Sequence, residues 1–267
     1  MDIFRLGFVE LIEDEVDLLK EFFKDVAGRV SDILEDIKVF RSGELKGLVT
    51  RESYEEIKEE IRALLYDSVD DIEDNLKESI RRVFRDIMEK SYEDINVYLP
   101  GTAMDEREEN AIEKLEEEYK GNTFRGRIVK AINRVMIDIE KDILHHRNEV
   151  IFERVIKRLV RRKVLFGGIS LYTWIHKLFI GEVGRLLSEE RVDMWKQLGI
   201  KRFRSRLSSM HSIMARKYGW EPGTEICEVK ARGKYYTFEQ IKKLHPIHAF
   251  CHCWAEPIYP KPVRVTD

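Results

Sequence analysis

The stretch "SYEEIKEEIRALLYDSVDDIEDNLKESIRRVFRDI" (53–87) decides the fold class of this chain. Its apolar residues recur at steps of three and four, which is the period of a helix with one buried face. Ser53 followed by Glu56 fits a capping box at the start of such a helix. We therefore predict one helix of about nine turns, whose stripe consists of Ile57, Ile61, Leu64, Leu65, Ile72, Leu76, Ile80, Val83, Phe84 and Ile87.

The same period continues through most of the first 198 residues. It predicts further helices over 8–37, 105–119, 124 to about 163 with a break near "HHRN" (145–148), and 170–198. Beyond Gly199 the units become shorter, and "ARGKYY" (231–236) is typical of a hairpin turn between two short strands. We therefore predict a mainly α protein with two parts, a helical body over 1–198 and a small α+β module over 199–267.

Composition indicates the setting in which the protein works. Charged residues make up 36% of the 267 positions, and glutamine occurs only twice, a balance typical of heat-adapted proteins. The longest uncharged apolar run, "VLFGGISLYTWI" (164–175), is too short to span a bilayer. Charged residues near the start interrupt any signal-peptide pattern. We therefore expect synthesis in the cytoplasm and no membrane partner.

Charge is distributed unevenly along the chain. Residues 1–120 hold 35 acidic and 18 basic residues, whereas residues 121–267 hold 15 and 29, so balances of −17 and +14 sum to the net −3. Two interpretations remain open. The halves neutralise each other within one fold, or the basic half serves nucleic acid or an acidic partner.

Two basic runs are the candidates for such a partner surface. "RVIKRLVRRK" (154–163) places Arg154, Lys157, Arg158, Arg161 and Arg162 near one helical face, and "KRFRSR" (201–206) interleaves Phe203 with Lys201, Arg202, Arg204 and Arg206. Cations in this arrangement contact phosphates without reading base sequence. For either run alone, a solvated face or contacts to the acidic half is the simpler interpretation, whereas the two runs together indicate DNA as a partner.

Soft metal ligands gather in "HPIHAFCHC" (245–253), near the C-terminal end of the sequence. Cys251 and Cys253 form C-x-C, His248 precedes them by three residues, and a hairpin over 231–236 returns Cys227 toward them. Three thiolates and one imidazole suit tetrahedral zinc. Because four protein ligands leave no open position for water, this zinc would be structural. His245 and His252 are competing ligands, and free thiols beside surface histidines are the alternative.

These residues also carry a family resemblance. The chain resembles, over about 170–267, the Mu F-type head morphogenesis proteins, which are minor capsid proteins of tailed phages and related archaeal viruses. The matching runs are "WKQLGIKRFRSRLSSMH" (195–211), Cys227-x5-Gly233-Lys234-x-Tyr236-Thr237 and Pro246-x-His248-x-x-Cys251-x-Cys253. Ala249, His252 and Lys230 depart from the family pattern, which has Pro, Arg and a second Cys there. The N-terminal helices match no family that we can name.

The resemblance implies a minor head protein of a virus or provirus, located in the virion and the host cytoplasm. Its expected partners are the portal protein or other capsid subunits, with DNA as a further partner and no small-molecule substrate. We expect no enzymatic activity, because the chain lacks H-E-x-x-H, G-x-S-x-G and P-loop motifs. The alternative is a zinc-stabilised nucleic-acid-binding protein outside any virion.

Overall fold

A computed structural model describes residues 3–36, 40–41, 44–45, 50–94, 100–119, 121–145, 151–160, 170–206, 235–244 and 254–258. These residues are mainly helical and include a small three-stranded sheet near the C-terminal end, so the predicted class is confirmed at that level. Internal contacts divide the chain into two units, Met1–Phe179 and Ile180–Asp267, with the division inside helix α7 (Leu171–Gln197). The predicted boundary after residue 198 stays a prediction.

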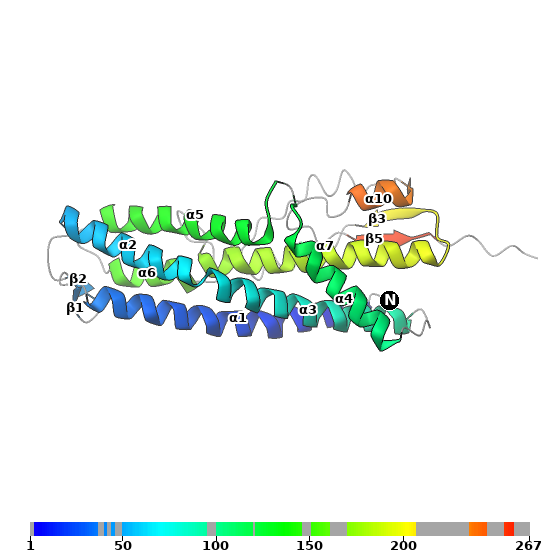
Figure 1. Cartoon of the computed structure of the whole chain (residues 1–267), viewed down its shortest axis with the longest axis horizontal. Coiled ribbons are helices and arrows are strands. Elements are labelled where there is room, and N and C mark those ends of the chain that lie inside the picture. The colour runs from blue at the N-terminus through cyan, green and yellow to red at the C-terminus, as the bar shows by residue number, and fades with distance from the viewer. Residues whose placement is uncertain are drawn as a thin grey trace, which may run out of the picture. The chain divides into compact units, whose positions relative to one another are not determined.

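The first unit is an array of packed helices (Figure 1). Helix α1 (Ile3–Asp36) contacts α2 (Arg51–Asp67), α3 (Val69–Asp94) and α6 (Ile151–Val160). Helix α5 (Phe124–His145) also contacts α2, α3 and α6, whereas α4 (Gly101–Glu116) lies on α3 and α5. A two-stranded hairpin, β1 (Phe40–Arg41) and β2 (Glu44–Leu45), follows α1. The predicted break near 145–148 is confirmed, because α5 ends at His145 and α6 begins at Ile151.

The core of this unit is built from the apolar stripes that the sequence predicts. Each helix contributes side chains at three- and four-residue steps, which bury one face against its neighbours. The first turns of α7 add a large aromatic contact, because the rings of Phe23 and Tyr172 meet edge to face at 5.9 Å. Fully buried members include Phe23, Val30, Ile57, Ile61, Leu65, Leu76, Ile80, Ile128, Ile132, Val135, Ile139, Val155, Leu159 and Phe179.

The stretch 53–87 forms two helices rather than the single helix predicted, because α2 ends at Asp67 and α3 begins at Val69. Between them, the Ser68 hydroxyl donates to the carbonyl oxygen of Leu64 at 2.8 Å. The predicted capping box also lies three residues earlier than expected, because Thr50 is the N-cap and Ser53 is its partner. The stripe continues across the break, since Leu65, Val69 and Ile72 are all buried.

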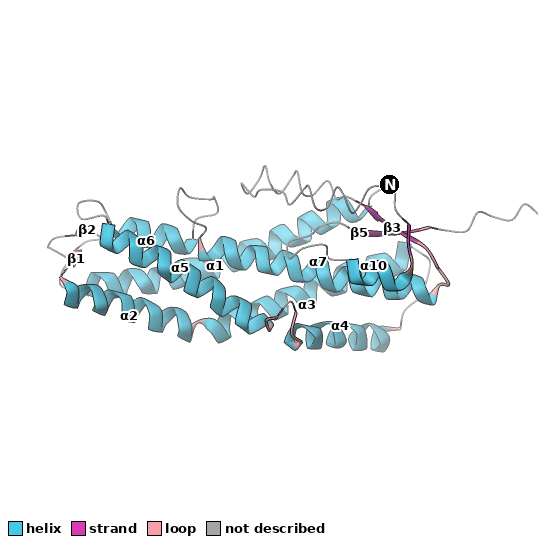
Figure 2. Ribbon diagram, turned by 90° about the horizontal axis from the view of Figure 1, so that it is seen from above, coloured by secondary structure: helices cyan, strands magenta, loops and turns pink. Residues whose placement is uncertain are grey.

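The second unit contains the end of α7 and the small sheet (Figure 2). The central strand β3 (Phe203–Arg206) pairs antiparallel with β4 (Tyr235–Tyr236) on one side and with β5 (Trp254–Pro257) on the other. Helix α10 (Phe238–Leu244) follows β4 and contacts both β4 and β3. The strand predicted to precede residues 231–236 lies outside the described residues.

The turn from α7 into β3 fixes the start of the sheet. Gly199 has φ +77°, a left-handed conformation that favours glycine after a helix C-terminus. The amide N–H of Gly199 donates to the carbonyl oxygen of Lys196, and that of Ile200 donates to the carbonyl oxygen of Trp195. The Trp195 ring then lies 6.2 Å from the buried ring of Phe203. The helix end and the central strand are therefore packed together by adjacent aromatic rings.

None of the helices in the described ranges is both long and apolar enough to cross a membrane.

Candidate functional site

The predicted zinc ligands Cys227, His248, Cys251 and Cys253 lie outside the described residues, as do His245 and His252. Within the described ranges, no group of three or more His, Cys, Asp or Glu side chains is arranged to hold a metal ion. The zinc site therefore stays a prediction. Its nearest described neighbour in sequence is Trp254, the first residue of β5, which directly follows Cys253.

Within the first basic run, Arg158 lies inside the helical unit rather than on its surface. Its residue is 8% exposed, and Nε donates to Oδ2 of Asp142 at 2.6 Å while Nη2 donates to Oδ1 at 3.2 Å. Asp138 is the second carboxylate, at 3.9 Å from Nη1. The hydrogen bond to Asp142 raises the pKa of Arg158 above its ordinary value. Arg158 therefore joins α6 to α5 and does not face an external phosphate.

The other members of this run are placed differently or lie outside the described residues. Arg154 and Lys157 are half-buried on α6, and both make further interactions within the protein. Arg161 and Arg162 follow the described end of α6. An external basic face at 154–163 therefore stays a prediction, with Arg158 removed from it.

Several ion pairs lie within one charge half of the chain rather than between the halves. In the acidic half, Arg82 pairs with Glu15 of α1, and Arg85 pairs with Asp105 and Glu108 of α4. One cation of the basic half does pair across, because Arg125 contacts Asp70 and Glu73. Within the basic half itself, acidic residues pair with basic residues of the same half. These basic residues are Arg158, Arg185, Arg206 and Lys242.

The second basic run forms the end of the α7–β3 turn and strand β3. Strand alternation buries Phe203 and Ser205 completely, and leaves Arg204 half-buried and Arg206 exposed. Lys201 and Arg202 precede the strand and are exposed. The period of two therefore sends the apolar and small side chains to one face and the arginines of β3 to the other.

The two strand arginines make different contacts. Arg206 forms an ion pair with Glu256 on β5, with Nε at 2.7 Å from Oε2. Arg204 instead faces Tyr235, its cross-strand partner on β4. The guanidinium carbon lies 5.2 Å from the ring centroid, and Nη2 donates to the phenol oxygen at 3.1 Å. Among the described residues, no carboxylate compensates the charge of Arg204, which lies beside an aromatic ring.

The described segments around the sheet carry an excess of positive charge. Segments 196–206, 235–244 and 254–258 hold seven basic residues and two acidic residues, Glu239 and Glu256. Lys242 pairs with Asp193 at 2.9 Å and Arg206 with Glu256. Across the described part of the chain, no carboxylate pairs with the other five, which are Lys196, Lys201, Arg202, Arg204 and Lys243. This set is the feature of the second unit that fits a polyanionic partner.

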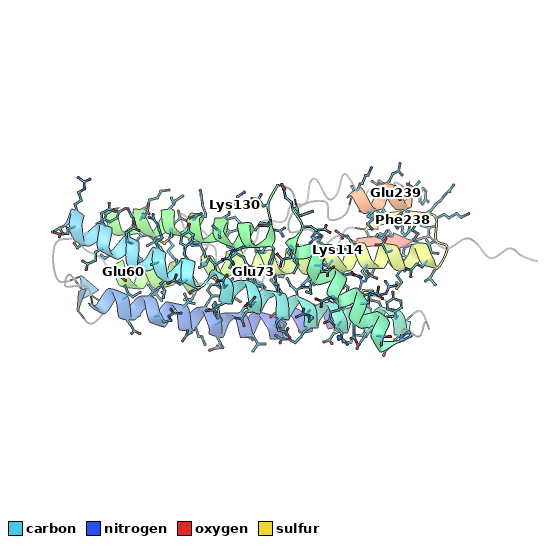
Figure 3. The ribbon with its side chains drawn as sticks, in the orientation of Figure 1. Glu60, Glu73, Lys114, Lys130, Phe238 and Glu239 are labelled. Atoms are coloured by element: carbon cyan, nitrogen blue, oxygen red, sulfur yellow. The ribbon has the colours of Figure 1, made fainter. Side chains whose placement is uncertain are left out.

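Helix α10 adds an aromatic ring to these cations (Figure 3). Its first turn is capped reciprocally, because the Gln240 side chain accepts from the Thr237 amide and Thr237 Oγ1 accepts from the Gln240 amide. This cap fixes the position of Phe238. The Nζ of Lys196 lies 3.9 Å from the Phe238 ring centroid, and that of Lys242 lies 5.6 Å from it, distances at which a cation is attracted to the ring face.

Two hollows flank α10. A cleft of about 340 Å³ lies between the α7–β3 turn and the start of α10, and is lined by Lys196, Gly199, Ile200, Lys201, Thr237, Phe238 and Glu239. A groove of about 660 Å³ is lined by Tyr235, Tyr236, Gln240, Lys243 and Leu244. Successive strand residues point to opposite faces, so a groove lined by both tyrosines lies beside β4, which is one of the two outer strands of the described sheet.

The cations of "KRFRSR" are predicted from the sequence, but their aromatic neighbours are not. Tyr235 and Phe238 lie about thirty residues downstream, and only the sheet register brings Tyr235 opposite Arg204. A usable signal exists in "TFEQ" (237–240), which fits the S/T-x-x-E/Q capping box and predicts a short helix after β4.

The chain was also compared with known proteins. No protein-family model, no curated protein and no solved structure matches it. Its function is therefore argued from its own residues.

Proposed function

We propose that this chain is a minor head morphogenesis protein of a tailed virus or provirus. In this role it acts without covalent chemistry, through contacts with the portal protein or other capsid subunits and with DNA. It would be found in the virion and in the host cytoplasm. In this proposal the helical unit contacts other proteins, and the small sheet contacts DNA.

One observation carries this proposal. The residues that resemble the head-protein motif fall in three separate segments of the sequence, and each has a described strand within it or beside it. Strand β3 lies within 195–211, β4 lies within the Gly233–Thr237 run, and β5 begins directly after Cys253. All three strands belong to one sheet in the order β4-β3-β5. A single module that unites the three motif segments is what the resemblance implies.

A structural zinc completes the proposed module. We propose Cys227, His248, Cys251 and Cys253 as its ligands, a set whose thiolates and imidazole match the preference of zinc. The described sheet is small, with strands of four, two and four residues. Modules of this size gain much of their stability from a bound metal or other cross-link.

The test is co-expression with the product of the gene immediately upstream, which this proposal expects to be the portal protein, followed by affinity purification and mass measurement. The expected result is a complex of defined mass that contains the portal ring and this chain. A portal from a virus with an unrelated head protein is the matched control and should not be retained. A chain that purifies alone in the presence of its own portal would contradict the proposal.

A second candidate is a zinc-stabilised nucleic-acid-binding protein outside a virion. The five cations that no described carboxylate pairs with favour it, because such a surface binds phosphates in any setting. The two candidates differ in a direct way. A nucleic-acid-binding protein without a head role binds DNA with an affinity that falls steeply with salt, and forms no complex with a portal.

A further inference from the structure

The exposed ring of Tyr235 is the feature of the second unit that the proposed portal contacts do not explain. Its residue is 59% exposed, more than any other large hydrophobic residue in the described part of the chain. One face of the ring is covered by the Arg204 guanidinium at 5.2 Å. Because Tyr235 is largely exposed and lines the groove beside β4, its ring is accessible to a molecule in that groove.

The groove has the lining of a site for a flat aromatic group. It is shallow and open rather than enclosed, with a volume of about 660 Å³, so it suits a ring that lies against a surface. Tyr235, Tyr236 and Leu244 supply apolar surface, Gln240 supplies an amide that both donates and accepts, and Lys243 supplies a charge.

The positive charge around the groove indicates which class of ligand would bind there. Lys243 within it and Arg204 beside Tyr235 have no carboxylate partner among the described residues, and Lys201 and Arg202 continue the same excess toward β3. A partner that offers flat rings joined by regularly spaced negative charges satisfies both features. Single-stranded nucleic acid has this chemistry, because its bases are free to stack on aromatic side chains while its phosphates meet cations. In duplex DNA the base faces are hidden within the stack.

We propose that Tyr235 stacks against one unpaired base of a single-stranded nucleic acid, whose phosphates contact Lys243 and Arg204. The arginine on the opposite face strengthens the ring as a platform, because it holds the phenol by both a hydrogen bond and a cation–π contact. This inference goes beyond the DNA contact of the proposed function, because it requires single-stranded rather than duplex nucleic acid.

The experiment is fluorescence anisotropy with the full-length protein and a labelled oligothymidylate of about 12 nucleotides, a length within the usual site size of such surfaces. Tyr235→Ala should weaken binding about tenfold or more at constant salt, the effect of one lost stacking contact. Tyr235→Phe keeps the ring and should bind within about twofold of the parent protein. Tyr66→Ala removes an exposed tyrosine of the helical unit and is the matched control, with unchanged binding expected.

Two further arms separate stacking from charge. Lys243→Gln should lower the slope of log affinity against log salt by about 0.7, the value for one phosphate contact on a single strand, whereas Tyr235→Ala should leave the slope unchanged. A fluorescent purine analogue in the oligonucleotide should be quenched by the parent protein and not by Tyr235→Ala. Far-ultraviolet circular dichroism confirms that each variant is folded.

Three results would overturn the inference. They are an unchanged affinity for Tyr235→Ala, an equal affinity for duplex DNA of the same length, and an equal affinity for polyglutamate of the same charge. The last would assign the surface to an acidic protein. Failure of the proposed function is distinguishable, because portal co-purification is measured separately and should be unaffected by Tyr235→Ala.

Discussion

Arg158 on α6 and Asp142 on α5 form a buried two-point ion pair, with Nε at 2.6 Å from Oδ2 and Nη2 at 3.2 Å from Oδ1. Both residues are less than a tenth exposed. Asp138, one helical turn before Asp142, brings a second buried carboxylate to 3.9 Å from the same guanidinium. Because a buried charge without a partner is costly, each member of this group holds the others in place.

Replacing Arg158 should therefore destabilise the helical unit strongly. Arg158→Met leaves two buried carboxylates and should lower the free energy of unfolding by about 3 kcal/mol, measured by urea denaturation. Arg134→Met changes an exposed arginine of α5 and should stay within about 0.5 kcal/mol of the parent protein. Replacing Arg158, Asp138 and Asp142 together by apolar residues should recover most of the loss. An Arg158→Met protein as stable as Arg134→Met would contradict the buried pair.

The position of Arg158 shows what helical periodicity predicts and where it fails. Periodicity predicts that Arg154 and Arg158 share a face, but Arg158 also lies three residues after Val155, which is fully buried. A charge at a position of the apolar stripe signals an internal partner. Asp138 and Asp142 carry the same signal on α5, and pairing the two signals requires knowledge of which helices are neighbours.

The division of 53–87 into two helices has a local cause that hydrophobic periodicity does not detect. The apolar stripe stays in phase across Ser68, so periodicity predicts a single helix. The competing signal is "SVDD" (68–71), where serine precedes acidic residues in the first turn of α3. The candidate site on the sheet depends instead on a register between Arg204 and Tyr235 that no local pattern contains.

Two glycines should respond to alanine with opposite signs. Gly28 lies exposed within α1, and Gly199 has φ +77°. An added Cβ meets no atom within 4 Å at either position, so crowding plays no part. Gly28→Ala should stabilise by about 1 kcal/mol through helix propensity, whereas Gly199→Ala should destabilise by about 1 kcal/mol through left-handed backbone strain. Thermal unfolding of both variants measures the difference, and equal melting temperatures would refute the assigned turn.

Tyr92 should make the protein sensitive to alkaline pH. Its phenol oxygen is buried and has no hydrogen-bond partner among the described residues. Burial raises the pKa of Tyr92 above its ordinary value of 10.0, with Arg107 opposing the rise. A raised folded-state pKa means that the contribution to stability is complete below about pH 10 and is lost as pH rises through the folded-state value.

Tyr92→Phe should therefore be more stable than the parent protein, by about 1 kcal/mol at neutral pH because an unpaired buried hydroxyl is removed. Its advantage should grow above pH 10. The cation–π contact from Arg107, at 5.6 Å in the parent, is available to phenylalanine as well. Tyr66→Phe, which removes an exposed hydroxyl bonded to Asn133, should show no growing advantage. Urea denaturation at pH 7 and pH 10.5 tests both variants, and parallel pH profiles for Tyr92→Phe and the parent would exclude the effect.

The proposed zinc ligands should control both metal content and stability. Cys251→Ser or Cys253→Ser should release zinc and lower the stability of the second unit by several kcal/mol, the scale of a lost structural metal. His248→Asn should do the same, whereas His252→Asn should retain zinc, because His252 is a competing histidine rather than a chosen ligand. Metal analysis and thermal unfolding, each with and without a chelator, measure the two properties together. Unchanged melting temperatures in both serine variants would contradict the proposed zinc site. Loss of zinc in His252→Asn, together with its retention in His248→Asn, would show that His252 is the ligand instead of His248.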